Sequence, residues 1–279
     1  MNTLPISYVL CPMDLSPIST NALEWANAVA RVRKAELRMF HVVATQAIVA
    51  AEDLSFNERD GMMGRLREAQ RRIDPDNRRV GGAVRQGDPG NQILQFARSL
   101  VADVIVMGAA GVERPARPMG SVTATVVARS DCPVLIVPSG RQVNSDRAGV
   151  FDHILCAVDL APSSNGVMRQ AVSLGWETHA HVVFVGVMTE PDPSRQKIND
   201  QLLAAVPPEA TEWCDVEVVV KAGEPATEIV KLATSDVDLL VIGPPRQWSS
   251  TTQAVLAKSL CPVLVTHDAR PLPYPSLER

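Results

Sequence analysis

The stretch Tyr8-Val-Leu-Cys-Pro-Met-Asp-Leu-Ser-Pro-Ile-Ser19 decides the fold, because it returns 145 residues later as His153-Ile-Leu-Cys-Ala-Val-Asp-Leu-Ala-Pro-Ser-Ser164. The same offset superimposes residues 35–43 on residues 180–188 without a gap. Three more matches follow in the same order, pairing 87–89 with 223–225, 103–108 with 238–243, and 132–137 with 261–266. Matches that keep one order indicate a tandem duplication. The second copy is the shorter of the two.

Length and composition agree with two ordinary domains. The chain has 279 residues, of which 46% are hydrophobic and 21% charged, enough apolar material for two packed cores. Its 27 Lys and Arg are slightly outnumbered by 31 Asp and Glu, which argues against a nucleic-acid partner. The basic stretch 65–79 also contains three acidic residues. We interpret it as a solvated helix face, with a polyanion contact as the open alternative.

The alternation of short apolar runs with longer amphipathic runs is typical of βαβ units in a parallel sheet. In the first copy the expected strands lie at about 7–12, 37–43, 79–85, 103–108 and 133–138. Polar, aperiodic sequence predicts a linker at 140–151, and a proline-rich end predicts an extended tail at 268–279. The predicted domains are therefore 1–139 and 152–267, each an α/β unit with a doubly wound parallel sheet.

Helix starts are marked by capping residues and prolines. Ser16 or Ser19 is expected to cap the first helix, and Pro89 suits the first turn of a helix over 92–101. Ser121 is expected to cap the helix that precedes the last strand of the first copy.

We find neither a targeting segment nor a metal-binding motif in this sequence. The first residues lack a charged segment followed by a long apolar one, and no stretch approaches the apolar length of a membrane span. We therefore expect a cytoplasmic protein without membrane contact. The five cysteines are widely spaced, with neither a CxxC pair nor zinc-ligand spacing, so we expect reduced thiols and no metal site.

The candidate site lies in the loop after the fourth strand of the first copy. Val104-Ile-Val-Met-Gly108 is followed by Ala-Ala-Gly111, then eight residues, then Gly120-Ser121-Val122 at the start of a helix. Ligands of open parallel sheets bind outside the carboxyl ends of the strands. Glycines let backbone N–H groups approach phosphate oxygens closely, and a helix amino terminus adds partial positive charge. The spacing therefore indicates a phosphate-binding loop.

In combination with other motifs, this loop resembles the nucleotide loop of universal stress proteins. The supporting motifs are Pro12-Met13-Asp14-Leu15-Ser16, the HVV at 41–43, the GDP at 87–89 and the CPVLIVP at 132–138. The spacer between Gly111 and Gly120 is one residue shorter than is usual in the family. The resemblance covers nearly all of both copies, and it implies Rossmann-like domains of the adenine nucleotide alpha hydrolase type with strand order 3-2-1-4-5 and helices on both faces.

The same resemblance implies that the first domain binds ATP, ADP or AMP, with or without Mg²⁺. Asp14 would accept hydrogen bonds from the adenosine, because an ionised carboxylate can only accept. Val42 would contact adenine through its backbone. The remaining residues implied at the site are Pro12 and Met107 beside the base or sugar, and Gly108, Gly111, Gly120, Ser121 and Val122 around the ribose and phosphates.

Structural roles remain open alternatives for these residues. Asp14 could cap the first helix, Gly111 could be a turn glycine, and Gly120-Ser121 could be an ordinary helix start. A phosphate contact is also open for two arginines of the spacer, Arg114 and Arg117. His41 is expected to pack beneath a helix.

The second copy departs from the first at the phosphate loop. Asp159 and Val187 stand at the positions of Asp14 and Val42, but Gly243 is followed by Pro244-Pro245-Arg246-Gln247-Trp248-Ser249 without a second glycine. Prolines remove backbone donors from the segment that should supply them. The sequence therefore predicts a degenerate second domain that supports the first, with binding of another anion there as the open alternative.

Three functions remain in competition. The leading hypothesis is a nucleotide-binding protein of stress response or signalling, acting on an unidentified partner. A slow ATPase or autophosphorylating enzyme is the second, although no P-loop, GxGxxG or nucleophile-elbow motif occurs. The third is a nucleotide-independent scaffold. In the family the last strand commonly mediates dimer contacts, which implies pairing of the two domains through their last strands and a possible homodimer.

Overall fold

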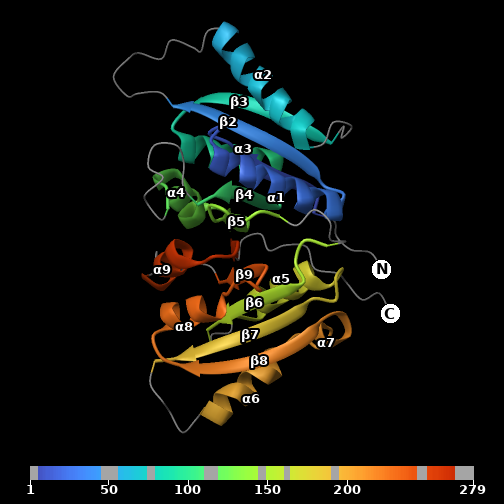
Figure 1. The fold of residues 1–279 in the computed structure, drawn as a ribbon, viewed down its shortest axis with the longest axis vertical. Helices are drawn as coiled ribbons and strands as arrows, with labels where there is room; N and C mark the ends of the chain where they lie inside the picture. The colour runs from blue at the N-terminus through green and yellow to red at the C-terminus, as the bar shows by residue number, and fades with distance from the viewer. Residues whose placement is uncertain are drawn as a thin grey trace. The chain divides into compact units, whose positions relative to one another are not determined.

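The computed structural model describes residues 6–44, 56–73, 79–109, 119–143, 149–159, 164–189, 195–243 and 250–267. Contacts divide the chain into two compact units, one of which is Pro5–Val143 and the other chiefly Asn144–Arg279. The division falls within the stretch 140–151 that the sequence predicts to be a linker. Each unit contains one copy of the repeat (Figure 1).

The first domain is a parallel sheet with helices between its strands, so the predicted α/β class is confirmed. Its strand order is β3-β2-β1-β4-β5. The strands are β1 (Tyr8–Pro12), β2 (Glu36–Ala44), β3 (Val80–Gly87), β4 (Val104–Gly108) and β5 (Val134–Val137), and the helices are α1 (Pro17–Arg33), α2 (Phe56–Ile73), α3 (Pro89–Leu100) and α4 (Ser121–Arg129).

The second domain repeats this arrangement with the strand order β8-β7-β6-β9-β10, again in parallel pairs. Its strands are β6 (His153–Val158), β7 (His181–Met188), β8 (Asp215–Ala222), β9 (Leu239–Ile242) and β10 (Val263–Val265). Its helices are α5 (Ser164–Gly175), α6 (Arg195–Ala205), α7 (Ala210–Trp213), α8 (Pro225–Leu232) and α9 (Ser250–Lys258).

Helices cover both faces of the first sheet. Right-handed crossovers put α1 and α2 on one face and α3 and α4 on the other, and each pair is in contact. The central strands β1 and β4 are consequently buried on both sides, which explains why they read as continuous apolar runs. Leu10 of β1 and Ile105 of β4 have no exposed surface.

The helix starts follow local sequence signals, except that α3 begins earlier than the sequence predicts. Ser16 caps α1 by accepting a hydrogen bond from the Ser19 N–H, as one of the two predicted alternatives requires. Asp88 caps α3 by accepting from the Asn91 N–H, and Pro89 is the first helical residue. The helix therefore starts three residues earlier than the predicted 92–101, because the aspartate cap and the proline together define its first turn.

The turn that joins β3 to α3 needs a glycine. Gly87 has a φ of +136°, and its equivalent Gly223, before α8, has a φ of +147°. A residue with a Cβ atom is strained at such positive φ values, which explains why both copies have glycine here. The cap that follows is Asp88 in one copy and Glu224 in the other, where hydrogen bonds from Thr227 hold the pKa of the Glu224 carboxyl below its usual value.

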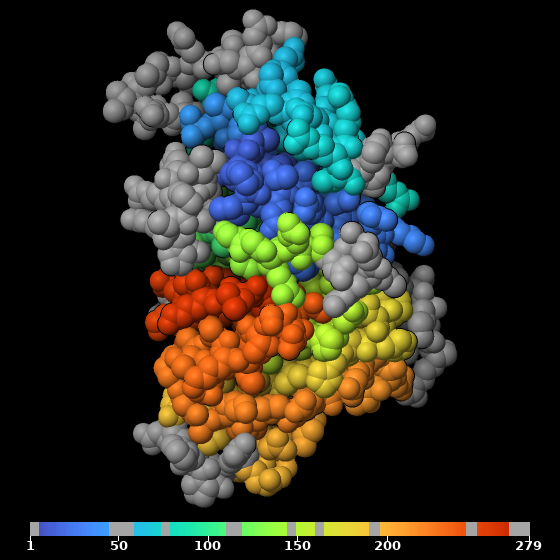
Figure 2. Space-filling model, viewed as in Figure 1, coloured from blue at the N-terminus to red at the C-terminus, as the bar shows by residue number. Residues whose placement is uncertain are grey.

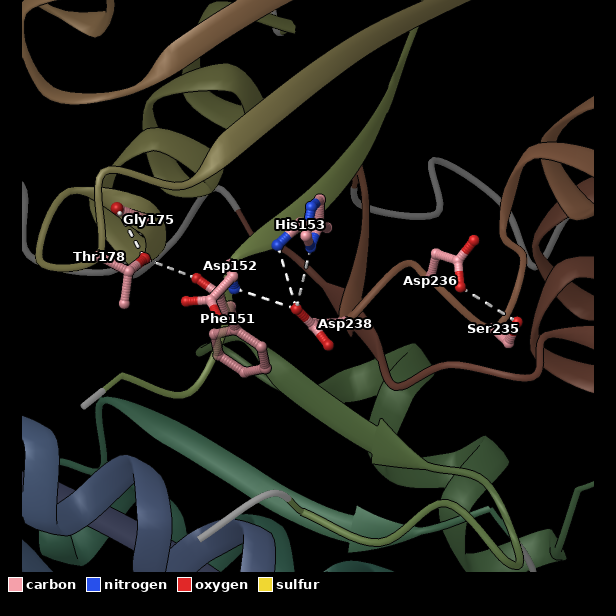
Figure 3. Close-up of polar contacts among 8 residues, drawn as sticks. All are labelled: Phe151, Asp152, His153, Gly175, Thr178, Ser235, Asp236 and Asp238. Carbon is pink, nitrogen blue, oxygen red and sulfur yellow. Dashed lines mark hydrogen bonds and ion pairs between the residues drawn. The ribbon is translucent and has the colours of Figure 1, made fainter. Parts of the chain in front are cut away.

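An aspartate ties neighbouring strands together in each domain; Asp103 is half-buried and Asp238 is buried. In the first, Asp103 Oδ2 accepts hydrogen bonds from the Ser7 and Tyr8 N–H groups at 2.7 and 2.9 Å. In the second, Asp238 Oδ2 accepts from the Asp152 and His153 N–H groups, both at 3.1 Å (Figure 3). The aspartate that opens the repeated motif 103–108 and 238–243 is thus a structural residue, which links the first strand of each copy to the fourth.

We predict that Asp238→Ala destabilises the second domain by about 1.5–3 kcal/mol, because two backbone donors lose a charged acceptor. The nearby Asp236 is exposed, and the contact drawn for it in Figure 3 is a long 3.4 Å hydrogen bond that it accepts from the Ser235 hydroxyl, so Asp236→Ala is the matched control. Urea denaturation of the full chain, followed by far-UV circular dichroism, measures both. Equal midpoints for the two variants would contradict the structural role of Asp238.

All five cysteines lie within the described residues, are buried, and are free of disulfides. Burial raises the pKa of the Cys11 and Cys156 thiols well above their usual range. Burial also raises the pKa of Cys214 to about 11. A thiol with so high a pKa is almost wholly protonated near neutral pH and is therefore a poor nucleophile.

We predict that Cys11, Cys156 and Cys214 in the native protein react with Ellman's reagent at pH 8 at least about 100-fold more slowly than free cysteine, because each added pKa unit lowers the thiolate fraction about tenfold. In urea all five should react at the rate of free cysteine. Fast labelling of any of these three thiols in the native protein would show that its burial is transient.

No helix within the described segments is long and apolar enough to cross a membrane. Over the same segments, His, Cys, Asp and Glu side chains form no group of three or more that could hold a metal ion.

Candidate functional site

The carboxyl edge of the first sheet collects most of the predicted site residues. The winding reverses between β1 and β4, which are adjacent and parallel with Leu10 opposite Ile105. Continuing this register brings Pro12 level with Met107, at the ends of their strands. Both side chains are buried. On the other side of β1, Val42 lies two residues beyond Phe40, the partner of Pro12. This is the edge at which open α/β sheets bind ligands.

Asp14 lies just beyond the end of β1 and is exposed. Its Oδ1 accepts a hydrogen bond from the Ser16 N–H at 3.0 Å, so the side chain closes a tight turn before α1. The helix itself is capped by Ser16. The alternative in which Asp14 serves as the helix cap is therefore wrong, and the carboxylate is displayed at the sheet edge instead.

His41 holds the turn that carries Asp14. Its Nδ1 lies 2.7 Å from the carbonyl oxygen of Met13, and the Met13 N–H donates to the Phe40 carbonyl at 2.8 Å. Because a carbonyl oxygen only accepts, Nδ1 must carry the hydrogen. The ring is half-buried in β2, so His41 ties the end of β1 to the neighbouring strand. Sequence reasoning expected it beneath a helix and missed this contact, which joins residues 28 positions apart.

The amino terminus of α4 has no side-chain cap. Gly120 occupies the cap position with φ −75° and ψ 153° and forms no side-chain cap hydrogen bond. The predicted cap, Ser121, is instead the first helical residue, because the glycine before it takes the extended conformation that a cap requires. α1 and α3 fill the same position with Ser16 and Asp88. A glycine cap keeps the first N–H groups of α4 clear for an external acceptor.

Backbone hydrogen bonds close the base of the loop between β4 and α4. The Ala109 N–H donates to Val137 at 3.0 Å, and the Gly120 N–H donates to Ala109 at 2.8 Å. The Thr123 hydroxyl donates to the Gly108 carbonyl at 3.0 Å and is buried. Because its N–H is bonded to Ala109, Gly120 cannot donate to a ligand, but it has no side chain that would cover the start of α4. The nearest backbone N–H groups that could donate are those of Ser121 and Val122. The loop residues 110–118, including Gly111, Arg114 and Arg117, lie outside the described residues.

An aromatic stack supports the sheet beside Val42. Phe40 of β2 and Phe96 of α3 stack with ring centroids 4.3 Å apart, and the Arg85 guanidinium lies 5.2 Å from the Phe96 centroid. Arg85 is also the register partner of Val42. The stack directs this arginine towards α3 through a cation–π contact. No local sequence pattern indicates it, because its three members come from three elements.

The second domain presents the corresponding residues only in part. Asp159 is exposed after β6, Val187 is half-buried in β7, and Gly243 follows β9. The residues 244–249, on which the expected loss of the phosphate loop rests, lie outside the described residues. The asymmetry between the two domains therefore stays a prediction from the sequence.

A model of the universal stress protein family matches residues 6–138 and 151–267, the two copies of the repeat. The chain belongs to the universal stress protein family. A universal stress protein of Methanocaldococcus jannaschii is 28% identical over 136 residues, which cover 46% of this chain and 80% of that protein.

Solved structures show the same fold over both domains of this universal stress protein. One from Archaeoglobus fulgidus has a TM-score of 0.74 at 20% identity and covers 94% of this chain and 97% of its own. A putative universal stress protein from Pseudomonas aeruginosa has a TM-score of 0.65 at 17% identity, and the match covers 95% of this chain and 94% of that protein. A shorter match is a universal stress protein from Archaeoglobus fulgidus solved in complex with dAMP, which covers only 42% of this chain and 98% of its own, with a TM-score of 0.37 at 23% identity.

Proposed function

We propose that the first domain binds an adenine nucleotide, ATP, ADP or AMP, and that occupancy changes the surface this universal stress protein presents to a partner in stress response or signalling. One observation carries the proposal. The uncapped amino terminus of α4 and the exposed carboxylate of Asp14 belong to the same edge of one sheet. They offer donors for phosphate and an acceptor for ribose hydroxyls or the adenine amine.

The other residues take roles that fit their positions. The buried side chains of Pro12 and Met107 supply apolar contact for the base or sugar. Val42 contacts adenine through its backbone. The phosphates lie at Ser121 and Val122, where the helix dipole favours negative charge. Gly108 and Gly111 let the loop approach the ribose, and Mg²⁺ accompanies the di- or triphosphate.

Isothermal titration of the full chain with ATP, ADP and AMP tests binding. We expect one nucleotide per chain, held by the first domain. Asp14→Ala should weaken ATP binding by about 10- to 100-fold, the equivalent of about 1.5–3 kcal/mol for a hydrogen bond to a charged group. Asp159→Ala, at the same place in the second copy, is the matched control and should bind normally. Absence of binding by the native chain, or equal effects of the two substitutions, would refute the proposal.

A second pair of variants tests the placement of the phosphates. Gly120→Asp and Gly120→Asn both put a good capping side chain at α4, but only the aspartate adds negative charge. We expect Gly120→Asp to lose more affinity than Gly120→Asn, by about tenfold for ATP, with a smaller gap for AMP because fewer phosphate charges are repelled. A gap that does not depend on the phosphate count would place the phosphates elsewhere. Circular dichroism checks that both variants fold.

A further inference from the structure

The charges of the chain are unevenly divided between its two halves. Residues 1–143 contain 17 Lys and Arg against 14 Asp and Glu, a net charge of +3. Residues 144–279 contain 10 against 17, a net charge of −7. The modest total of −4 therefore conceals two domains of opposite sign.

The positive charge of the first domain gathers where its strands begin. Helices that alternate with parallel strands run in the opposite direction, so the carboxyl ends of α1 and α2 lie at the amino ends of β2 and β3. The Asn27 amide donates to the Ile73 carbonyl at 3.4 Å and joins the end of α2 to α1. We call this surface the basic end. It consists of Arg31, Arg33, Lys34, Arg38, Arg71, Arg72 and Arg79.

Hydrogen bonds link three of these residues, Lys34, Arg38 and Arg79, directly, and the others are placed beside them by the ends of α1 and α2. Arg79 donates to the Lys34 carbonyl, and Arg38 donates to the Arg79 carbonyl at 3.4 Å. Five of the seven cations are exposed, and Figure 2 shows α2, in cyan, on the outside of the domain. Against these seven cations stand Glu36, which contacts Arg38, Glu68, which contacts Arg72, and Asp103, the equivalent of Asp238. The basic end therefore keeps a surplus of positive charge.

The second domain carries acids at the corresponding place. We call this surface the acidic end. It consists of Asp152, Glu177, Asp215, Glu217, Asp236 and Asp238, with the histidines His153, His179 and His181 among them (partly shown in Figure 3). His181 lies between two of the acids, with Nδ1 2.9 Å from Asp215 Oδ2 and Nε2 3.5 Å from Glu217 Oε2. Glu177, Asp215, Glu217 and Asp236 are exposed.

At two equivalent positions of the repeat the charge differs between the two ends. Lys34 has a left-handed φ of 56°, and its equivalent His179 has a φ of 50°. Alignment of Gly87 with Gly223 places Arg79 on Asp215. Each copy folds with its own charges, so the shared fold requires neither set. The opposite signs therefore need an explanation other than the stability of the domain.

We propose that the basic end of the first domain binds the acidic end of the second domain in another copy of this chain. The opposite charges of the two ends favour such docking and steer the encounter of the two copies. The contact is heterologous, because it joins different surfaces of the two copies. Both ends lie at the amino side of their sheets, opposite the edge where the nucleotide is proposed to bind, so the inference stands independently of that function. A polyanion would satisfy the basic end alone and would be repelled by the second domain.

Sedimentation velocity of the full chain tests the contact. At about 20 mM salt we expect concentration-dependent association, and at about 500 mM salt, where exposed charges are screened over a few ångströms, we expect monomers. The double variant Lys34→Glu/Arg71→Glu and the double variant Glu177→Lys/Asp215→Lys should each weaken association at least about tenfold. Circular dichroism confirms that each variant folds.

Combining the two charge-reversed double variants shows whether the basic end and the acidic end bind each other. A mixture of the two double variants should associate again, because one keeps its acidic end and the other its basic end. The fourfold variant should also associate, with the charges exchanged. Glu24→Lys/Asp200→Lys changes the net charge as much as the acidic-end reversal but at exposed positions of α1 and α6, and it should behave as the native chain.

Three results would overturn the proposal. The first is a native chain that stays monomeric at low salt up to about 100 μM, a concentration at which even weak specific contacts are populated. The second is association that neither salt nor the reversals change. The third is association lost on reversing the basic end but not the acidic end, together with salt-sensitive binding of heparin, which would identify a polyanion as the occupant.

Discussion

The parallel pairing of β1 with β4 is the constraint on which both the fold and the candidate site depend. At its amino end, the Asp103 carboxylate ties the start of β1 to the start of β4 through two backbone N–H groups. At its carboxyl end the winding reverses, so the turn with Asp14 and the strand end at Gly108 emerge side by side. One interaction at the bottom of the sheet therefore sets the alignment of groups at the top.

Comparing the two copies of the repeat distinguishes residues that the fold requires from features that are present in one copy alone. Both copies retain the aspartate between the central strands, the glycine with positive φ and the acidic cap that follows it. These residues satisfy backbone groups or permit backbone angles, and their loss would affect either domain alike. The loop after the fourth strand and the charges at the amino ends of the strands differ between copies. Such surface features can diverge after duplication because packing does not restrain them.

Much of the first domain follows from local sequence signals. The apolar runs predict the strands within a few residues, and Ser16 and Pro89 mark helix starts because capping is a local interaction. Ser121 shows where local reasoning fails. Serine is a favoured cap, yet the backbone turns at Gly120, and hydrogen bonds to Ala109 decide where the helix begins. The stack of Phe40, Phe96 and Arg85 has no local signal at all.

The sequence by itself determined the duplication, the α/β class, the family resemblance and the residues that end each central strand. Periodicity, repeat spacing and motif order depend only on the order of residues along the chain, so they can be recognised without a structure. Only the tertiary structure decided that α4 lacks a side-chain cap, that His41 holds the turn of Asp14, and that Lys34, Arg38 and Arg79 contact one another at the amino ends of β2 and β3. These features depend on contacts between residues far apart in the chain, and such contacts exist only once the helices have packed on the sheet.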